Sequence, residues 1–143
     1  MNASKQAVGL LGGSFDPVHN GHLSIARSFT DSGYISELWI LLTPESPHKR
    51  DQESTDYHHR LQMLSLAFKD QENIRVCGIE KQRLSPPYYT VKTLKYLTEH
   101  HKDKKFYLCM GEDSLMNFHT WHQWKEILNY SDLLVARRPS FQP

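Results

Sequence analysis

A glycine-rich break between two apolar segments constrains this sequence most. The apolar residues 8–11 lead into residues 12–23, which read GGSFDPVHNGHL, and apolar residues at helical spacing follow. This order predicts a strand, a loop and a helix, the geometry of a phosphate-binding turn. Gly12 and Gly13 allow a ligand to approach the backbone where a Cβ would clash. The start of the predicted helix offers unpaired N–H groups to an anion.

Two histidines stand at the entry to that predicted helix. His19 and His22 are three residues apart, so both can face the same side. Two imidazoles placed there can donate hydrogen bonds to phosphate oxygens and stabilise charge that develops on them. The alternative interpretation is a tight turn that carries two surface histidines.

Apolar and amphipathic segments alternate along the whole chain and predict a single domain over residues 1–143. Strands are predicted at residues 8–11, 37–42, 74–79, 105–110 and 133–136. Helices are predicted at residues 21–32, 55–69, 89–100, 113–118 and 121–129, with Gly33 ending the first. Mostly apolar strands between helices indicate an α/β fold with a doubly wound, Rossmann-like sheet of five parallel strands and flanking helices. In such a sheet, ligands bind beyond the carboxyl ends of the strands.

The charge, the cysteines and the apolar runs of the sequence indicate which kinds of molecule the protein can bind. Seventeen basic and sixteen acidic residues leave a formal charge of +1, which argues against nucleic acid and favours a small charged molecule. Cys77 and Cys109 lie in apolar runs and are expected to be reduced core residues of a cytoplasmic protein. No apolar run approaches the length of a membrane span, so no membrane partner is expected.

Further candidate residues follow other predicted strands. Lys49, after the second strand, can place a point charge on a phosphate or can be a solvated loop lysine. After the fourth strand, Asp113 can accept hydrogen bonds from ribose hydroxyls, and Gly111 would let the sugar approach. Trp121 offers a flat face for stacking, although the spacing of Trp121 and Trp124 alone favours two core residues.

Residues 12–22 resemble the signature of the nucleotidyltransferase superfamily with a His-x-Gly-His motif. Residues 88–94 are similar to the Ser-Tyr-Thr-x-x-Thr-Leu stretch of bacterial nicotinate-nucleotide adenylyltransferases, with Tyr88 in place of the serine. Tyr89 and Thr90 in that stretch have packing and helix capping as their alternative roles. Arg137-Arg138-Pro139 is similar to the family's Arg-Pro-Gly turn. The resemblance therefore covers nearly the whole chain.

The resemblance implies adenylyl transfer from ATP to nicotinate mononucleotide in NAD synthesis, with Mg²⁺ bridging the ATP phosphates and no metal-ligating residues in the protein. It implies His19 and His22 as catalytic residues. The implied ATP-binding residues are Gly12, Gly13, Ser14, Phe15, His19, His22, Gly111, Asp113 and Arg138. The implied residues for the mononucleotide are Lys49, Tyr89, Thr90, Trp121 and His122.

Two other functions stay open on the sequence. A sister enzyme, of the phosphopantetheine or cytidylyl type, would share the histidine motif. A catalytically incomplete nucleotide-binding module is the second, because the family's Ile-Ser-x-Thr-x-Ile-Arg segment is not found in these 143 residues. The sequence also leaves open a homo-oligomer and the preference between nicotinate and nicotinamide.

Overall fold

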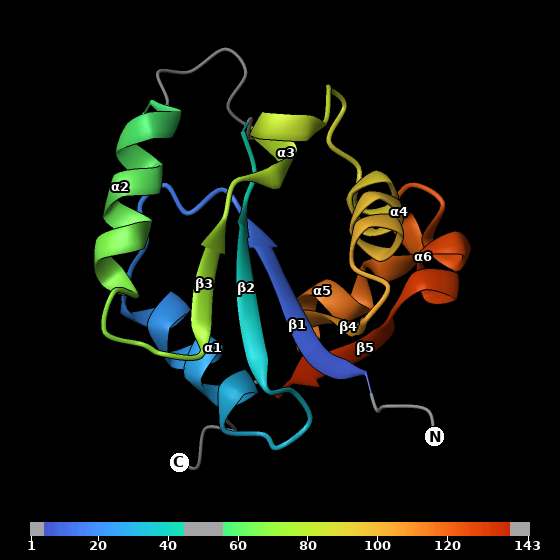
Figure 1. The fold of residues 1–143 in the computed structure, drawn as a ribbon, viewed down its shortest axis with the longest axis horizontal. Coiled ribbons are helices and arrows are strands. Elements are labelled where there is room, and N and C mark those ends of the chain that lie inside the picture. Colours follow the sequence, from blue (N-terminus) through green and yellow to red (C-terminus); the bar gives the residue numbers. More distant parts are fainter. Residues whose placement is uncertain (1–4, 45–55, 138–143) are drawn as a thin grey trace.

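The computed structural model describes residues 5–44 and 56–137, and it is built around one parallel sheet (Figure 1). The strand order is β3-β2-β1-β4-β5, and every neighbouring pair is parallel. The strands are β1 (Gln6–Gly13), β2 (Glu37–Leu42), β3 (Ile74–Cys77), β4 (Lys104–Gly111) and β5 (Asp132–Ala136). The predicted five-stranded, doubly wound sheet is confirmed.

Helices follow the strands as crossovers. They are α1 (Asn20–Thr30), α2 (Tyr57–Ala67), α3 (Ile79–Arg83), α4 (Thr90–His100), α5 (Glu112–Met116) and α6 (Trp124–Tyr130), with the short 3₁₀ helix η2 (Phe118–Thr120). None of the helices within the described ranges is long and apolar enough to cross a lipid bilayer.

Most element boundaries differ from the prediction by one to three residues, and helix α3 was not predicted. The structure gives the cause of three of the differences. Strand β3 ends at Cys77 rather than at residue 79, because its pairing with β2 stops at the Leu41–Cys77 pair, and the chain turns directly into α3. Helix α6 begins at Trp124 rather than at residue 121, because Gln123 takes a left-handed conformation with φ 51°. Helix α1 ends at Thr30, and Gly33 with φ 83° belongs to the following turn.

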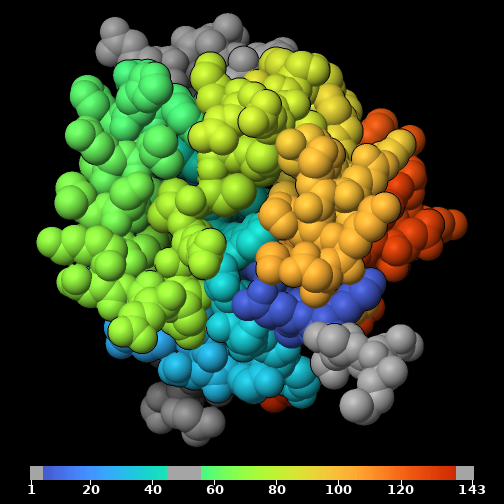
Figure 2. Space-filling view, in the orientation of Figure 1, coloured from blue at the N-terminus to red at the C-terminus, as the bar shows by residue number. Residues whose placement is uncertain are grey.

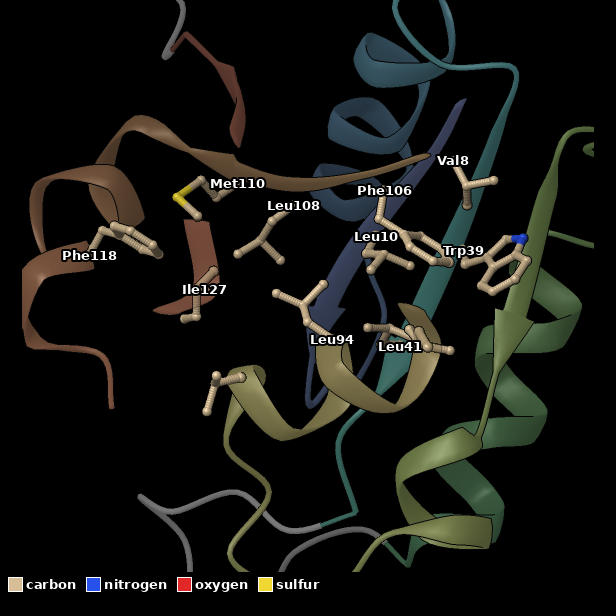
Figure 3. Packing of buried hydrophobic residues seen from close by; sticks show 12 residues of the cluster. Val8, Leu10, Trp39, Leu41, Leu94, Phe106, Leu108, Met110, Phe118 and Ile127 are labelled. Atoms are coloured by element: carbon tan, nitrogen blue, oxygen red, sulfur yellow. The ribbon is translucent and has the colours of Figure 1, made fainter. Parts of the chain in front are cut away.

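The strands alternate their side chains between two apolar layers. Val8 and Leu10 of β1 face the layer covered by α4 and α6, in which Leu94 points to the sheet (Figure 3). Leu11 belongs to the opposite layer, which α1 and α2 supply with residues such as Phe29 and Leu64. Because both faces of the inner strands are buried, these strands read as continuous apolar runs in the sequence.

The order of the strands places a crevice at the carboxyl end of β1. From β1 the chain moves outward through β2 to β3 and then returns to the other side of β1 with β4. The connections that lead from β1 to β2 and from β3 to β4 therefore run in opposite directions from β1. The carboxyl end of β1 is the topological switch point of the sheet. In the space-filling view, the yellow-green and gold surfaces around α3 and α4 lie beside the cyan surface of β2 (Figure 2).

Candidate active site

A cavity of about 660 Å³ opens at the switch point, a volume typical of small-molecule sites. Its walls come from the loop after β1, the first turn of α1, the ends of β2 and β4, and the helices α3 and α4. Most of the residues that the sequence predicted for the site line it: Gly12, Gly13, Ser14, Phe15, His19, His22, Thr90, Gly111 and Trp121.

The two histidines cap helix α1 and fix each other. His19 is the N-cap residue, and its Nδ1 accepts a hydrogen bond from the backbone N–H of Gly21 at 3.1 Å. Nδ1 of His22 accepts one from the backbone N–H of His19 at 3.0 Å. This is a capping box in which imidazoles take the usual hydroxyl and carboxylate positions. Each ring is thereby held by the backbone of the helix that it caps.

The capping bonds also determine which ring nitrogens carry protons. Because both Nδ1 atoms accept, a neutral imidazole at either position has its proton on Nε2. Burial lowers the pKa of His22, and the neighbouring charge on His19 lowers it further. His22 is therefore neutral at neutral pH, and its Nε2–H is a donor in the cavity wall.

Two close approaches explain glycines in the motif. A Cβ at Gly21 would lie 2.9 Å from Cε1 of His19, and a Cβ at Gly13 would lie 3.2 Å from the ring of Phe15. Phe15 itself is buried, has φ 44°, and meets the His22 ring edge-on with centroids 4.8 Å apart. Phe15 therefore packs against the His22 ring and also lines the cavity.

Arg60 of α2 holds the loop after β1 in place, a role that no sequence pattern indicated. Its guanidinium is buried and donates to the carbonyl oxygens of Ser14 and Thr43 at 2.9 Å and of Pro44 at 2.8 Å. One side chain thus joins the exits of β1 and β2, which form neighbouring parts of the cavity wall.

The opposite wall carries the candidates for the mononucleotide. Thr90 and Trp121 line the cavity, whereas Tyr89 and His122 do not. Tyr89 and His122 are exposed and stack on each other with centroids 4.0 Å apart, which links the start of α4 to the segment before α6. Trp124, which the pattern grouped with Trp121, packs against the buried Phe118 and does not line the cavity.

The remaining predicted residues are placed differently. Asp113 is exposed in the first turn of α5 and is not part of the cavity wall, although Gly111 and Ser114 on either side of it are. Lys49 and Arg138 lie outside the described residues.

Glu80 of α3 is a wall residue that the sequence did not single out. The side chain is buried, and its Oε2 accepts a hydrogen bond from Oγ1 of Thr93 at 2.8 Å. Burial raises the pKa of this carboxyl group, and the hydroxyls of Thr93 and Thr43 partly oppose the rise. Because α3 was not predicted, nothing in the local pattern indicated that this carboxyl group faces the site.

A metal ion at this site would have few ligands among the described residues. Within residues 5–44 and 56–137, no group of three or more His, Cys, Asp or Glu side chains is arranged to hold a metal ion. Mg²⁺ is commonly bound through substrate phosphates and water, with few protein ligands. The described wall is therefore compatible with a magnesium ion that arrives with a nucleotide.

Comparison with known proteins places this chain in a family. Residues 10–143 match the model of the cytidylyltransferase-like family. Three relatives each carry the name "Probable nicotinate-nucleotide adenylyltransferase". They come from Christiangramia forsetii (37% identical over 92% of this chain), Shewanella frigidimarina (33% over 94%) and Flavobacterium johnsoniae (38% over 95%). The chain spans 67%, 63% and 70% of their respective lengths.

A solved structure of an enzyme with a related name has a similar fold. The structure of Plasmodium falciparum nicotinic acid mononucleotide adenylyltransferase complexed with NaAD matches with a TM-score of 0.75 and 19% identity, over 96% of this chain and 77% of that one. This likeness confirms the Rossmann-like architecture, and the sequence relatives confirm the resemblance seen in the motifs. The chain belongs to the cytidylyltransferase-like family and, within it, to the nicotinate-nucleotide adenylyltransferases.

Proposed function

We propose that this protein transfers the adenylyl group of ATP to nicotinate mononucleotide, giving nicotinate adenine dinucleotide and pyrophosphate in NAD synthesis. The observation that carries the proposal is the His19–His22 pair, held by backbone hydrogen bonds at the start of α1 and lining the cavity. The names of the sequence relatives support the same reaction.

The chemistry asks for positioning and charge stabilisation rather than for a general base. The 5′-phosphate oxygen of the mononucleotide attacks the α-phosphorus of ATP and forms a new P–O bond. The bond from the α-phosphorus to the bridging oxygen breaks, and pyrophosphate leaves with the electron pair. Since the nucleophile is already an anion, the protein has no proton to remove, and catalysis rests on orientation and electrostatics.

The wall residues fit these tasks in two groups. Ser14, His19 and His22 would meet the ATP phosphates, with the N–H groups at the start of α1 beside them. Mg²⁺, when bound with ATP, would neutralise charge on the phosphates. Gly12, Gly13 and Phe15 shape this end of the cavity.

The second group of residues would bind the adenosine ribose and the pyridine ring and phosphate of the mononucleotide. We assign Trp121 and Thr90 to the pyridine ring, and Gly111 and Asp113 to the adenosine ribose. Tyr89 and His122 do not line the cavity, but they precede and follow the wall residues Thr90 and Trp121 in the chain, and their stacked pair would bind the mononucleotide from there. Lys49 for the mononucleotide phosphate and Arg138 for ATP complete the proposal from outside the described residues.

We also propose that the chain forms one nucleotidyltransferase domain and that the protein is cytoplasmic. Burial raises the pKa of the Cys109 thiol to about 12 and also raises that of Cys77. Neither thiol is thereby a reactive thiolate at neutral pH, which agrees with structural cysteines in a reducing compartment.

The test is a comparison of acceptors. The 143-residue chain is incubated with ATP, Mg²⁺ and either nicotinate mononucleotide, nicotinamide mononucleotide or phosphopantetheine, and the products are identified by mass spectrometry. We expect nicotinate adenine dinucleotide as the main product. Dephospho-coenzyme A as the main product would instead support the sister enzyme that uses phosphopantetheine.

A further inference from the structure

Two side chains beside the first turn of α4 have no part in the mechanism above. Tyr88 is half-buried and lines the same cavity as Thr90 and Trp121. In the stretch that resembles the adenylyltransferases, Tyr88 stands where the family pattern has serine, and Lys92 stands at a position that the pattern leaves open. A large aromatic side chain therefore takes the place of a small one in the cavity wall.

Lys92 holds the turn that carries Tyr88. From the first turn of α4, its Nζ donates hydrogen bonds to the carbonyl oxygens of Ser85 at 2.8 Å and of Pro87 at 2.9 Å. The Pro87 carbonyl also accepts the backbone N–H of Tyr89 at 3.1 Å, which closes a three-residue turn around Tyr88. One ammonium group thus ties the connection between α3 and α4 to the helix that follows it (Figure 1).

A second contact brings the segment of Tyr88 to that of Trp121. The rings of Tyr89 and His122, the residues that follow Tyr88 and Trp121, stack with centroids 4.0 Å apart. The two chain segments therefore meet at this point, and in each of them the residue before the stacked ring lines the cavity. Since Trp121 is assigned to the pyridine ring, Tyr88 stands in the wall of the same part of the cavity.

The pyridine ring of a mononucleotide suits an aromatic wall. Its nitrogen is bonded to the ribose, and this bond gives the ring a positive charge. The faces of aromatic side chains attract cations, an interaction that an aliphatic side chain of similar size does not provide. Reduction of the ring to a dihydropyridine removes the charge and leaves the ribose and phosphate unchanged. An aromatic residue beside the ring should therefore distinguish the two forms of the ligand.

We propose that Tyr88 is a substrate-binding residue whose ring faces the pyridinium ring of the mononucleotide, and that Lys92 is the positioning residue that holds it there. The inference rests on the proposed function and names a contact that the shared motif does not contain. Affinity for the mononucleotide then depends on a lysine that does not itself line the cavity. ATP, which is assigned to the histidine end of the cavity, should be insensitive to both residues.

Calorimetry on the 143-residue chain tests the Tyr88 contact without needing turnover. Dissociation constants are measured for nicotinate mononucleotide, for its reduced form with an uncharged dihydropyridine ring, and for ATP with Mg²⁺. Tyr88→Leu keeps apolar volume but loses the aromatic face, and we expect it to bind nicotinate mononucleotide about tenfold more weakly. The loss for the reduced form should be about threefold or less, and ATP binding should not change. Tyr88→Phe should stay within about threefold of wild type for each ligand.

A double-mutant cycle tests the role of Lys92. Lys92→Met keeps a long side chain and removes two hydrogen bonds to exposed residues, so the variant should fold as the wild type does. We expect nicotinate mononucleotide binding to weaken about fivefold in the wild-type background and to change by less than about twofold in the Tyr88→Leu background. Lys95→Met, the same substitution at an exposed position one turn further along α4, should behave as wild type.

Three results would overturn the inference. Tyr88→Leu could bind the mononucleotide as the wild type does, or it could lose the charged and the reduced forms equally, which would assign Tyr88 to packing alone. A loss of the same size for Lys92→Met in both backgrounds would show that Lys92 does not act through Tyr88. A wild-type chain that does not bind nicotinate mononucleotide contradicts the proposed function and the inference with it, whereas wild-type binding with an unaffected Tyr88→Leu contradicts the inference alone.

Discussion

The imidazole rings of His19 and His22 stack with centroids 3.8 Å apart and planes inclined by 29°. Each ring turns its Nδ1 to a backbone N–H group of the same helical turn, so the pair is one preorganised unit rather than two independent side chains. Gly21 between them supplies one of those N–H groups and the space for the His19 ring. The spacing of the motif therefore follows from the geometry of a capped helix.

The stability of the protein should depend on pH through His22. Burial makes its folded pKa lower than its unfolded value of 6.5, so the folded state binds fewer protons than the unfolded state. The contribution of His22 is then complete above pH 6.5 and is lost as the pH falls below it. Urea denaturation at pH 7.5 and pH 5.5 should show a smaller loss of stability in His22→Gln than in wild type. Equal losses in the two proteins would contradict this.

Gly21→Ala should separate activity from stability. The new Cβ would meet the His19 ring at 2.9 Å and displace it, so we expect the turnover rate to fall about tenfold or more. The free energy of unfolding should change by less than about 1 kcal/mol, since alanine favours the helix. Ser24→Ala, on an exposed part of the same helix, is the control. Full activity in Gly21→Ala would show that the His19 position is not critical.

Arg60→Met should destabilise the protein and disturb the loop after β1. It removes three hydrogen bonds from a buried cation to backbone carbonyls, and we expect a loss of about 3 kcal/mol in the free energy of unfolding. The matched control is Arg75→Met. The guanidinium of Arg75 forms an ion pair with Glu37, and the Arg75 side chain is 71% exposed. That change should cost less than about 1 kcal/mol. Similar losses in the two variants would argue against the role given to Arg60.

The two tryptophans should have different roles. Trp121→Ala should raise KM for the mononucleotide about tenfold or more while leaving KM for ATP near the wild-type value. Trp124→Ala should instead lower the free energy of unfolding by about 3 kcal/mol, because Trp124 packs on Phe118. Steady-state kinetics and chemical denaturation of both variants measure the difference. A loss of stability without a change in KM in Trp121→Ala would place that residue in the core alone.

What could be predicted from the sequence was local. The parallel sheet followed from apolar runs that alternate with amphipathic segments, and the histidine pair followed from a motif that lies within one strand–loop–helix unit. Glu80 and Arg60 could not be found in this way. Glu80 depends on Thr93, thirteen residues away, and Arg60 reaches the Ser14 carbonyl across forty-six residues. Contacts over such distances exist only once the fold has formed.

Trp121 and Trp124 show a second limit of pattern analysis. Their spacing suggested a shared helical face and a shared core role. The left-handed Gln123 precedes the first turn of α6, so Trp124 begins that helix, whereas Trp121 lies outside it and lines the cavity. A single backbone conformation decides this outcome, and a glutamine carries little signal for it.

Pyrophosphate release by the 143-residue chain and by His22→Ala tests the central claim most directly. With ATP, Mg²⁺ and nicotinate mononucleotide, we expect release that depends on the mononucleotide and that falls about a hundredfold or more in the variant, the scale of removing a preorganised donor. Release at the same rate in both proteins, or release that does not depend on the mononucleotide, would contradict the account.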